Sequence, residues 1–264
     1  MSFPPTERFF IDAVRDNLDR VSDPVLRRQV GDFIHQEAMH NKVHTSCNAI
    51  LARDYPNCSR AERISLGLFR FLGKLPRRFR LSLSSALEHF TSMVADTLLR
   101  YPTEFSKIFP REVAEMWIWH AAEETEHKSV CFDVYCSAYG NGPLSYVDRV
   151  LGMLLATPLF LFVMLAAGAV ALGQPRVSAA PASPVAPPLP EEPAAPADAV
   201  EGSDADRFMG RNILTLLWQS IPWRVYFSYY RPSFHPWDHD NRDLIATWKS
   251  RYPGFGVGTA SARP

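Results

Sequence analysis

The chain has 264 residues, a formal net charge of zero and a pI of about 7.1. This length suffices for one sizeable core, or for one domain with appendages, and the balanced charge gives no electrostatic case for a nucleic-acid partner. None of the four cysteines lies in a CxxC pair, which argues against a zinc knuckle or a thioredoxin-type site. We therefore expect reduced thiols within helices at Cys47, Cys58, Cys131 and Cys136.

The first 140 residues have the pattern of helices. Apolar residues recur at helical spacing over 5–21, and Ser22 or Asp23 followed by Pro24 is typical of a helix start. Further helices are expected over 24–53, 60–75 and 80–101, and from Pro110 to about Tyr139, where the sequence GNGP breaks the pattern. The chain is thus predicted to be all-α, with a helical bundle over residues 1–143.

The second half of the chain has a different composition. Residues 150–172 form an uncharged run long enough to cross a bilayer, so a membrane-associated apolar helix is expected at 144–173. The alternative is a helix that is buried in the core or lies on the bundle. The Pro/Ala-rich stretch 174–206 predicts a disordered linker. The aromatic-rich segment 207–264 suits an interfacial belt or a lid on the bundle, with a last short helix that starts after Asp240 or Asn241.

The N-terminus lacks a basic region followed by an apolar stretch, so no cleavable signal peptide is expected. Together with the apolar helix, this predicts a membrane-associated protein whose bundle is cytoplasmic.

Two short motifs suggest metal binding. Glu37 and His40 form an ExxH within HQEAMHNKVH, and Glu124 and His127 form another within HAAEETEH. Positions i and i+3 share one helix face, so both side chains of each motif can reach one metal ion. One ExxH is weak evidence, but two on separate predicted helices are more informative. Helical dinuclear carboxylate sites combine two such motifs with a lone glutamate from each of two other helices.

The lone glutamates are available at Glu7 and Glu88. With turns centred near residues 22 and 106, Glu7 is expected level with Glu37, and Glu88 level with Glu124. We therefore predict a site for two divalent metal ions, expected to be iron, with Glu7, Glu37, His40, Glu88, Glu124 and His127 as metal ligands.

Two further histidines lie one helical turn from these motifs. His44 follows His40, and His120 precedes Glu124. If the two helices are antiparallel, His44 and His120 meet at one end of the site, where they could be catalytic, could bind metal or could orient the carboxylates. Alternatively, both stripes form a solvated face. Bordering apolar residues favour an inward orientation: Phe33, Ile34, Ala38, Ile50, Leu51, Trp117, Ala121, Val130 and Val134.

Several nearby residues are predicted not to be metal ligands. His35 is off the stripe. Glu123, Glu126 and His89 should point away on helical geometry, either as surface residues or as residues that contact the ligands from outside. The basic and aromatic stretch 69–80 suits an anionic bilayer surface or a solvated crossover about equally well. The sequence HPWDHD at 235–240 could bind a second metal, although a capped turn with Trp237 packed inward is favoured.

The chain resembles a bacterial family of predicted metal-dependent hydrolases. The resembling stretches are TERFF, FIHQEAMHNKVH, ALEHFT, WHAAEETEHKSVCFDVY and SFHPWDHDN, which span about residues 4–172 and 207–252. More distantly, the ligand pattern is similar to that of ferritin-like di-iron proteins, which activate dioxygen. This resemblance implies a ferritin-like four-helix bundle. His44 and His120 depart from the simplest di-iron pattern.

Three functions follow as alternatives. We expect first a dioxygen-dependent oxidation of a small lipophilic substrate at the membrane, which needs an electron donor, because imidazole and carboxylate ligands suit iron. The second is hydrolysis of an ester, amide or phosphate by metal-activated water, as the family description implies. The third is a metal-binding membrane protein without enzymatic activity.

Overall fold

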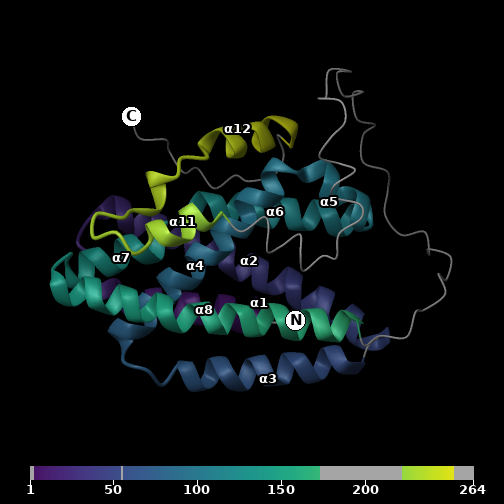
Figure 1. Cartoon of the computed structure of the whole chain (residues 1–264), viewed down its shortest axis with the longest axis horizontal. Helices are drawn as coiled ribbons and strands as arrows, with labels where there is room; N and C mark the ends of the chain where they lie inside the picture. The colour runs from purple at the N-terminus through teal and green to yellow at the C-terminus, as the bar shows by residue number, and fades with distance from the viewer. Residues whose placement is uncertain (1–2, 55, 173–221, 253–264) are drawn as a thin grey trace.

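The computed structural model describes residues 3–54, 56–172 and 222–252, and within them all regular structure is helical (Figure 1). The all-α prediction is confirmed. The predicted linker at 174–206 lies outside the described residues. The four cysteines are free thiols, two of them buried, as expected.

The first two helices form a hairpin. Helix α1 spans Phe3–Arg15, and a short 3-10 helix, η1, follows at Leu18–Arg20, so the continuous helix predicted over 5–21 is wrong in its last turn. The Asn17 side chain bonds back to the Ala13 carbonyl (2.8 Å) where α1 ends. Helix α2 spans Pro24–Asp54, and Asp23 Oδ1 accepts the Val25 N–H (2.9 Å), which confirms Asp23 as the capping residue.

Helices α3 (Pro56–Leu72) and α4 (Arg77–Arg100) both begin about one turn earlier than predicted. Helix α4 lies among the other helices and packs against α1, α6, α7 and α8 (Figure 1). In the basic stretch 69–80, which runs from the end of α3 into the first turn of α4, Arg78 pairs with Asp148 and Arg80 with Asp16. Part of its charge is therefore neutralised within the protein, which favours the crossover interpretation.

The helix predicted from Pro110 to Tyr139 is interrupted. It consists of α6 (Arg111–His127) and α7 (Val130–Tyr139), preceded by the short α5 (Pro102–Ile108). At the break, Lys128 Nζ donates to the His239 carbonyl and to Asn241 Oδ1, both at 2.7 Å. The interruption therefore coincides with the point where the C-terminal segment attaches to the bundle.

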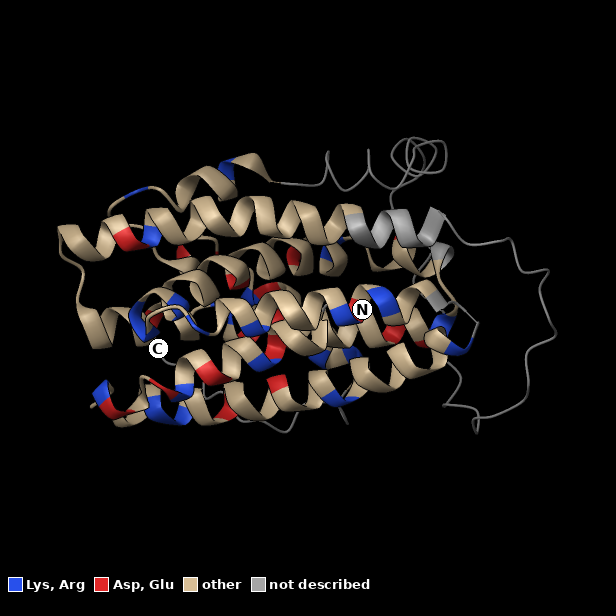
Figure 2. Ribbon diagram, turned by 90° about the horizontal axis from the view of Figure 1, so that it is seen from below, with Lys and Arg blue, Asp and Glu red and all other residues tan. Residues whose placement is uncertain are grey.

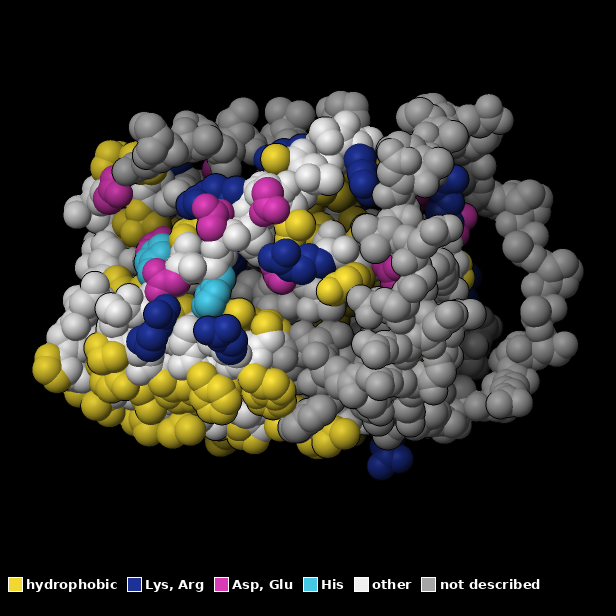
Figure 3. Space-filling view, turned by 45° about the horizontal axis from the view of Figure 1, so that its top comes forward, with side chains coloured by type: hydrophobic (Ala, Val, Ile, Leu, Met, Phe, Trp, Pro, Cys, Tyr) yellow, Lys and Arg dark blue, Asp and Glu magenta, His cyan; other side chains and the backbone are white. Residues whose placement is uncertain are grey.

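Helix α8 (Pro143–Leu172) packs on α4 and also contacts α3. By length and composition alone, its Pro143–Leu165 part could cross a membrane, and 28% of its most apolar window is buried. Few residues of α8 are charged, as the colouring of its ribbon in Figure 2 shows. In the space-filling view of Figure 3, hydrophobic side chains form a band along the lower edge of the molecule. One face is buried against the bundle. The opposite face exposes Leu144, Val147, Leu151, Leu154, Leu155, Leu161, Phe162 and Leu165.

The C-terminal segment covers part of the bundle, as the lid interpretation predicts. It contains α11 (Trp223–Ser228), the 3-10 helix η2 (Pro236–Asp238) and α12 (Arg242–Arg251). Tyr229 is 1% exposed, and His89 Nε2 lies 3.2 Å from the Val225 carbonyl, so His89 is a buried anchor rather than a surface residue. His235 caps η2, which confirms the capped turn at 235–240.

Candidate metal centre

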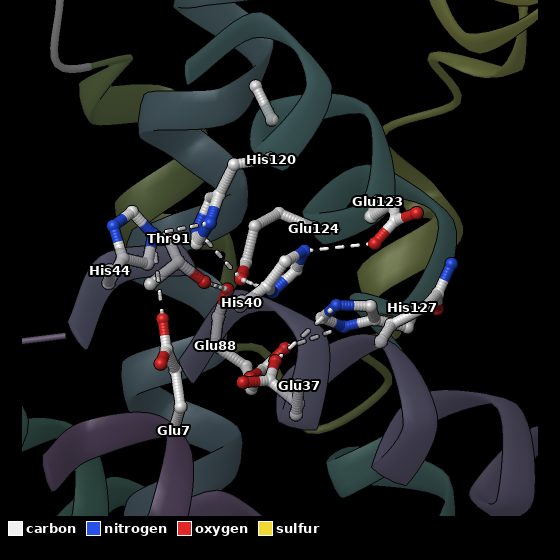
Figure 4. A network of polar contacts seen from close by, with 12 residues as sticks. Glu7, Glu37, His40, His44, Glu88, Thr91, His120, Glu123, Glu124 and His127 are labelled. Carbon is white, nitrogen blue, oxygen red and sulfur yellow. Dashed lines mark hydrogen bonds and ion pairs between the residues drawn. The ribbon is translucent and has the colours of Figure 1, made fainter. Parts of the chain in front are cut away.

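Four helices converge on a buried cluster of glutamate and histidine side chains (Figure 4). Helix α1 contributes one glutamate and α4 another, whereas α2 and α6 each contribute an ExxH and one further histidine. Every predicted site residue is buried, with exposed fractions of 4% or less. This set comprises Glu7, Glu37, His40, His44, Glu88, His120, Glu124 and His127. The inward orientation of the two stripes is therefore confirmed.

The first group joins the two ExxH motifs. Glu37, His40, Glu124 and His127 each offer one ligand atom, and these atoms all lie within 4.8 Å of one another. His127 Nε2 is 3.4 Å from Glu37 Oε1, and its Nδ1 is 3.3 Å from Glu88 Oε2. Glu88 thus adjoins this group through His127.

The second group lies at one end of the first. Glu7, His44 and His120 also offer ligand atoms within 4.8 Å of one another. His44 Nε2 is 2.9 Å from His120 Nδ1 and 3.6 Å from Glu7 Oε1. The prediction that His44 and His120 meet is confirmed.

Glu124 connects the two groups. Its Oε1 is 3.2 Å from His120 Nε2 in the second group and 3.7 Å from His40 Nδ1 in the first. A carboxylate placed between two ligand groups is suited to bridge two metal ions. This arrangement gives Glu124 a central position that its place in an ExxH motif does not reveal.

The predicted register holds for one helix pair and not for the other. Glu88 contacts His127, one turn from its expected partner Glu124. Glu7, however, lies beside His44 rather than level with Glu37, a shift of about two turns. The sequence pattern places the turn near residue 22, directly after a helix over 5–21, whereas α1 ends at Arg15 and η1 follows it, which makes the connection longer.

Other orientations also differ from the prediction. Glu123 does not point away, because its Oε2 lies 3.0 Å from His40 Nε2. Ile50 and Leu51, expected to border the inward stripe, are 60% and 40% exposed, and Ala38, expected there too, is also exposed. His35 is exposed, as predicted, and Glu126 faces Gln36 and Lys249 outside the cluster.

Aromatic rings cover the second group. Phe3 stacks on His44 with ring centroids 4.8 Å apart, and Trp117 lies 5.0 Å from His44 and 5.5 Å from His120. Because these rings are apolar on their faces, they reduce the access of water to the imidazoles. Sequence reasoning did not assign Phe3 any role.

The ionisation of the cluster reflects its burial. Burial, together with the nearby Glu124 carboxylate, raises the pKa of Glu7 to about 9. Burial and the neighbouring carboxylates also raise the pKa of Glu37 well above its ordinary value. Burial and His120 lower the pKa of His44 to about 3, so this imidazole is neutral at pH 7.

In two groups the neighbouring charges shift the pKa against the effect of burial. Burial alone would raise the pKa of Glu124, but the hydrogen bond from His120 and the charge of His127 hold it at about 2. Burial would likewise lower the pKa of His127, but the adjacent Glu88 carboxylate and other nearby carboxylates raise it to about 9. A bound cation could therefore displace protons from some groups of the cluster and neutralise the negative charge of its ionised carboxylates.

The polar atoms of the cluster meet the requirements of a metal site. Both carboxylate oxygens of Glu7, Glu37 and Glu88 are buried without a hydrogen-bond partner, and so are both ring nitrogens of His40 and His127. Buried polar atoms without partners are costly. Metal coordination would satisfy them, and carboxylate oxygen with imidazole nitrogen is a donor set that binds divalent transition metals.

A comparison with protein families agrees with this geometry. The family model described as "Predicted metal-dependent hydrolase" matches residues 1–240. The chain belongs to the predicted metal-dependent hydrolase family. No curated protein and no solved structure matches the chain. The match to this hydrolase family covers all the residues of both ligand groups.

The contact between Trp119 and Glu123 in this hydrolase-family protein was not predicted from the sequence. Glu123 and Trp119 lie four residues apart on α6 and bond to each other, with Trp119 Nε1 donating to Glu123 Oε1 at 3.0 Å. The i, i+4 spacing makes the pair possible. Nothing in the sequence shows that α2 brings His40 up to it.

Proposed function

We propose that the protein is a hydrolase that binds two divalent metal ions within the helical bundle. The observation that carries this proposal is the set of buried Glu and His atoms without hydrogen-bond partners, contributed by four helices. Membership of the hydrolase family supports the reaction class. The arrangement of two ExxH motifs with two lone glutamates also supports a ferritin-like four-helix bundle.

The two ligand groups suggest how the ions would be held. Glu37, His40, Glu88 and His127 would hold one ion, and Glu7, His44 and His120 the other, with Glu124 shared between them. Bound in this way, the ions would lower the pKa of a coordinated water and polarise the ester, amide or phosphate that it attacks. Phe3 and Trp117 would keep bulk water away from this end of the site.

A second candidate is dioxygen-dependent oxidation. It is favoured by the ligand types, since the cluster contains imidazoles and carboxylates, and this set suits iron. This reaction needs electrons from an external donor. Family membership supports hydrolysis more directly, so oxidation is the alternative.

The outward face of α8 supports a membrane location and a small lipophilic substrate. Eight large apolar side chains of α8 are exposed on this face, and a contiguous apolar face of this kind is unusual for a helix that faces water. We propose that this face of α8 binds the cytoplasmic surface of a lipid bilayer. A substrate dissolved in the bilayer would then be close to the bundle.

One experiment tests whether the protein binds metal and distinguishes hydrolysis from oxidation. The full chain is purified in detergent, its metal content is measured, and hydrolysis of chromogenic esters, amides and phosphates is assayed. Dioxygen uptake by the Fe(II)-loaded protein is recorded in parallel. Metal-dependent hydrolysis without dioxygen uptake supports the proposal, and uptake without hydrolysis supports the alternative.

Matched variants provide the control. Glu37→Ala and Glu124→Ala should abolish metal binding and activity, whereas Glu112→Ala, on the exposed side of α6, should leave both unchanged. Less than about one metal ion per chain, unchanged in Glu37→Ala and Glu124→Ala, would refute the metal site itself.

A further inference from the structure

The two ring nitrogens of His40 face different carboxylates. The side chain is fully buried. Nδ1 points to Glu124 Oε1 within the first ligand group, at 3.7 Å. Nε2 lies 3.0 Å from Glu123 Oε2, outside the group, but the two atoms are not aligned as a hydrogen bond (Figure 4). One nitrogen is therefore available for a metal ion while the other meets a carboxylate outside the two ligand groups.

Glu123 is itself fixed in place. Its second oxygen, Oε1, accepts a hydrogen bond from Trp119 Nε1 at 3.0 Å. The Trp119 ring also packs edge-on against the His40 ring, with centroids 5.0 Å apart and planes at 80°. Trp119 thus contacts both the Glu123 carboxylate and the His40 imidazole.

We propose that Glu123 is a positioning residue: a small rotation of the His40 ring lets Glu123 Oε2, 3.0 Å away, accept the Nε2–H, and this presents the Nδ1 lone pair to a metal ion. In a neutral imidazole only one nitrogen carries the proton, and the hydrogen bond made by the outer nitrogen decides which. Metal-binding histidines in general donate their other N–H to a carboxylate, a carbonyl or a water. This inference rests on the proposed metal site, although it concerns a residue outside both ligand groups.

The second ExxH histidine differs. His127 directs Nε2 to Glu37 and Nδ1 to Glu88, so both of its nitrogens face carboxylates expected to bind metal. The residue of α2 that corresponds to Glu123 is Gln36, which precedes Glu37, and its amide donates to Glu126 instead (3.0 Å). The Glu123–His40 contact is therefore specific to one half of the site.

Zinc affinity of the full-length protein in detergent tests the proposal. We expect Glu123→Ala to weaken Zn²⁺ binding about 10- to 100-fold while the number of ions bound at saturation is unchanged. Glu123→Gln keeps one acceptor oxygen for two donors, so its loss of affinity should be smaller. Trp119→Phe should weaken binding in the same direction, and Glu112→Gln is the matched control on the exposed side of α6.

A second readout detects the proton directly. In ¹⁵N-edited NMR spectra of the zinc-loaded protein, His40 should be protonated at Nε2, and this signature should weaken in Glu123→Ala.

Unchanged zinc affinity with a lowered unfolding temperature would overturn the proposal, since Glu123 would then be only structural. A loss of bound zinc at saturation would overturn it too, since Glu123 would be a ligand. If the parent protein binds no zinc, the proposed function fails as well, whereas normal binding in Glu123→Ala refutes only this inference.

Discussion

His44 Nε2 lies 2.9 Å from His120 Nδ1, and this contact joins α2 to α6 at one end of the Glu and His cluster. At this distance one imidazole donates and the other accepts a hydrogen bond. His120 Nε2 remains directed at Glu124, 3.2 Å away. The pair therefore continues the row of proposed metal ligands from Glu7 to Glu124 instead of forming a separate polar contact.

The first prediction concerns this pair. His44→Ala should lower the metal content from about two ions per chain to about one, because the second group loses a donor while the first keeps its glutamates and His127. The metal content is measured on purified protein by atomic emission. His35→Ala is the control, since His35 is exposed on the same helix. Full metal content in His44→Ala would show that His44 is not a ligand.

The second prediction concerns pH. Glu7, whose burial raises its pKa to about 9, carries a proton in the metal-free protein at neutral pH. This proton binds more tightly to the folded than to the unfolded chain, so Glu7 contributes less stability to the metal-free protein as pH rises from 4.5 towards 9. A metal ion must displace that proton, so zinc affinity should rise between about pH 5.5 and 7.5, by up to about tenfold per pH unit for each proton displaced.

Glu7→Gln tests the assignment of this proton. The variant has no carboxyl proton at position 7, so the slope of log affinity against pH should fall by about one. His44 is neutral across this range because burial lowers its pKa to about 3, and it contributes no slope. The slope is obtained from chelator-competition titrations. An affinity that does not depend on pH would contradict the prediction.

The ligand stripes could be predicted because they depend on local geometry. Glu37 with His40, and Glu124 with His127, share helix faces through the i, i+3 spacing, whatever the tertiary structure is. The meeting of His44 and His120 required only that α2 and α6 be antiparallel. Apolar bordering residues were less informative, because Ile50 and Leu51 lie on the exposed side of α2.

Other features depend on contacts that the sequence pattern does not encode. Glu123 reaches His40 because of the rotation of α6 relative to α2, and helical spacing alone pointed it away. The break between α6 and α7 occurs where Lys128 bonds to His239, more than 100 positions later in the chain. Glu7 shifted by two turns because the hairpin connection contains a 3-10 helix. Each of these is a tertiary effect.

The third prediction concerns the outward face of α8. Replacing Leu151, Leu154 and Phe162 with serine should release the protein from phospholipid vesicles, because each large apolar side chain contributes about 1.5–3 kcal/mol when it leaves water. Vesicle flotation measures the bound fraction. Val113→Ser on α6 removes a comparably exposed apolar residue and should have no effect. If the triple variant floats with the vesicles as well as the parent does, this face is not the membrane contact.

The fourth prediction concerns the contact between α8 and α4. A Cβ atom added at Gly152 would lie 2.6 Å from Ser82 Oγ and 3.0 Å from the Ser82 carbonyl oxygen, so Gly152 allows the two helices to approach closely. Gly152→Ala should therefore destabilise the protein by about 1–3 kcal/mol, although alanine is the better helix former. The free energy of unfolding is measured by denaturant titration in detergent.

Gly31 in α2 is the matched control for this substitution. A Cβ atom at Gly31 would meet no atom within 4 Å, so Gly31→Ala should stabilise the protein by up to about 1 kcal/mol through helix propensity alone. Opposite signs at the two glycines would establish that α8 is docked on α4 in solution. If Gly152→Ala stabilised the protein as Gly31→Ala does, α8 would be detached from the bundle, and a helix that crosses the bilayer would become the better interpretation of Pro143–Leu165.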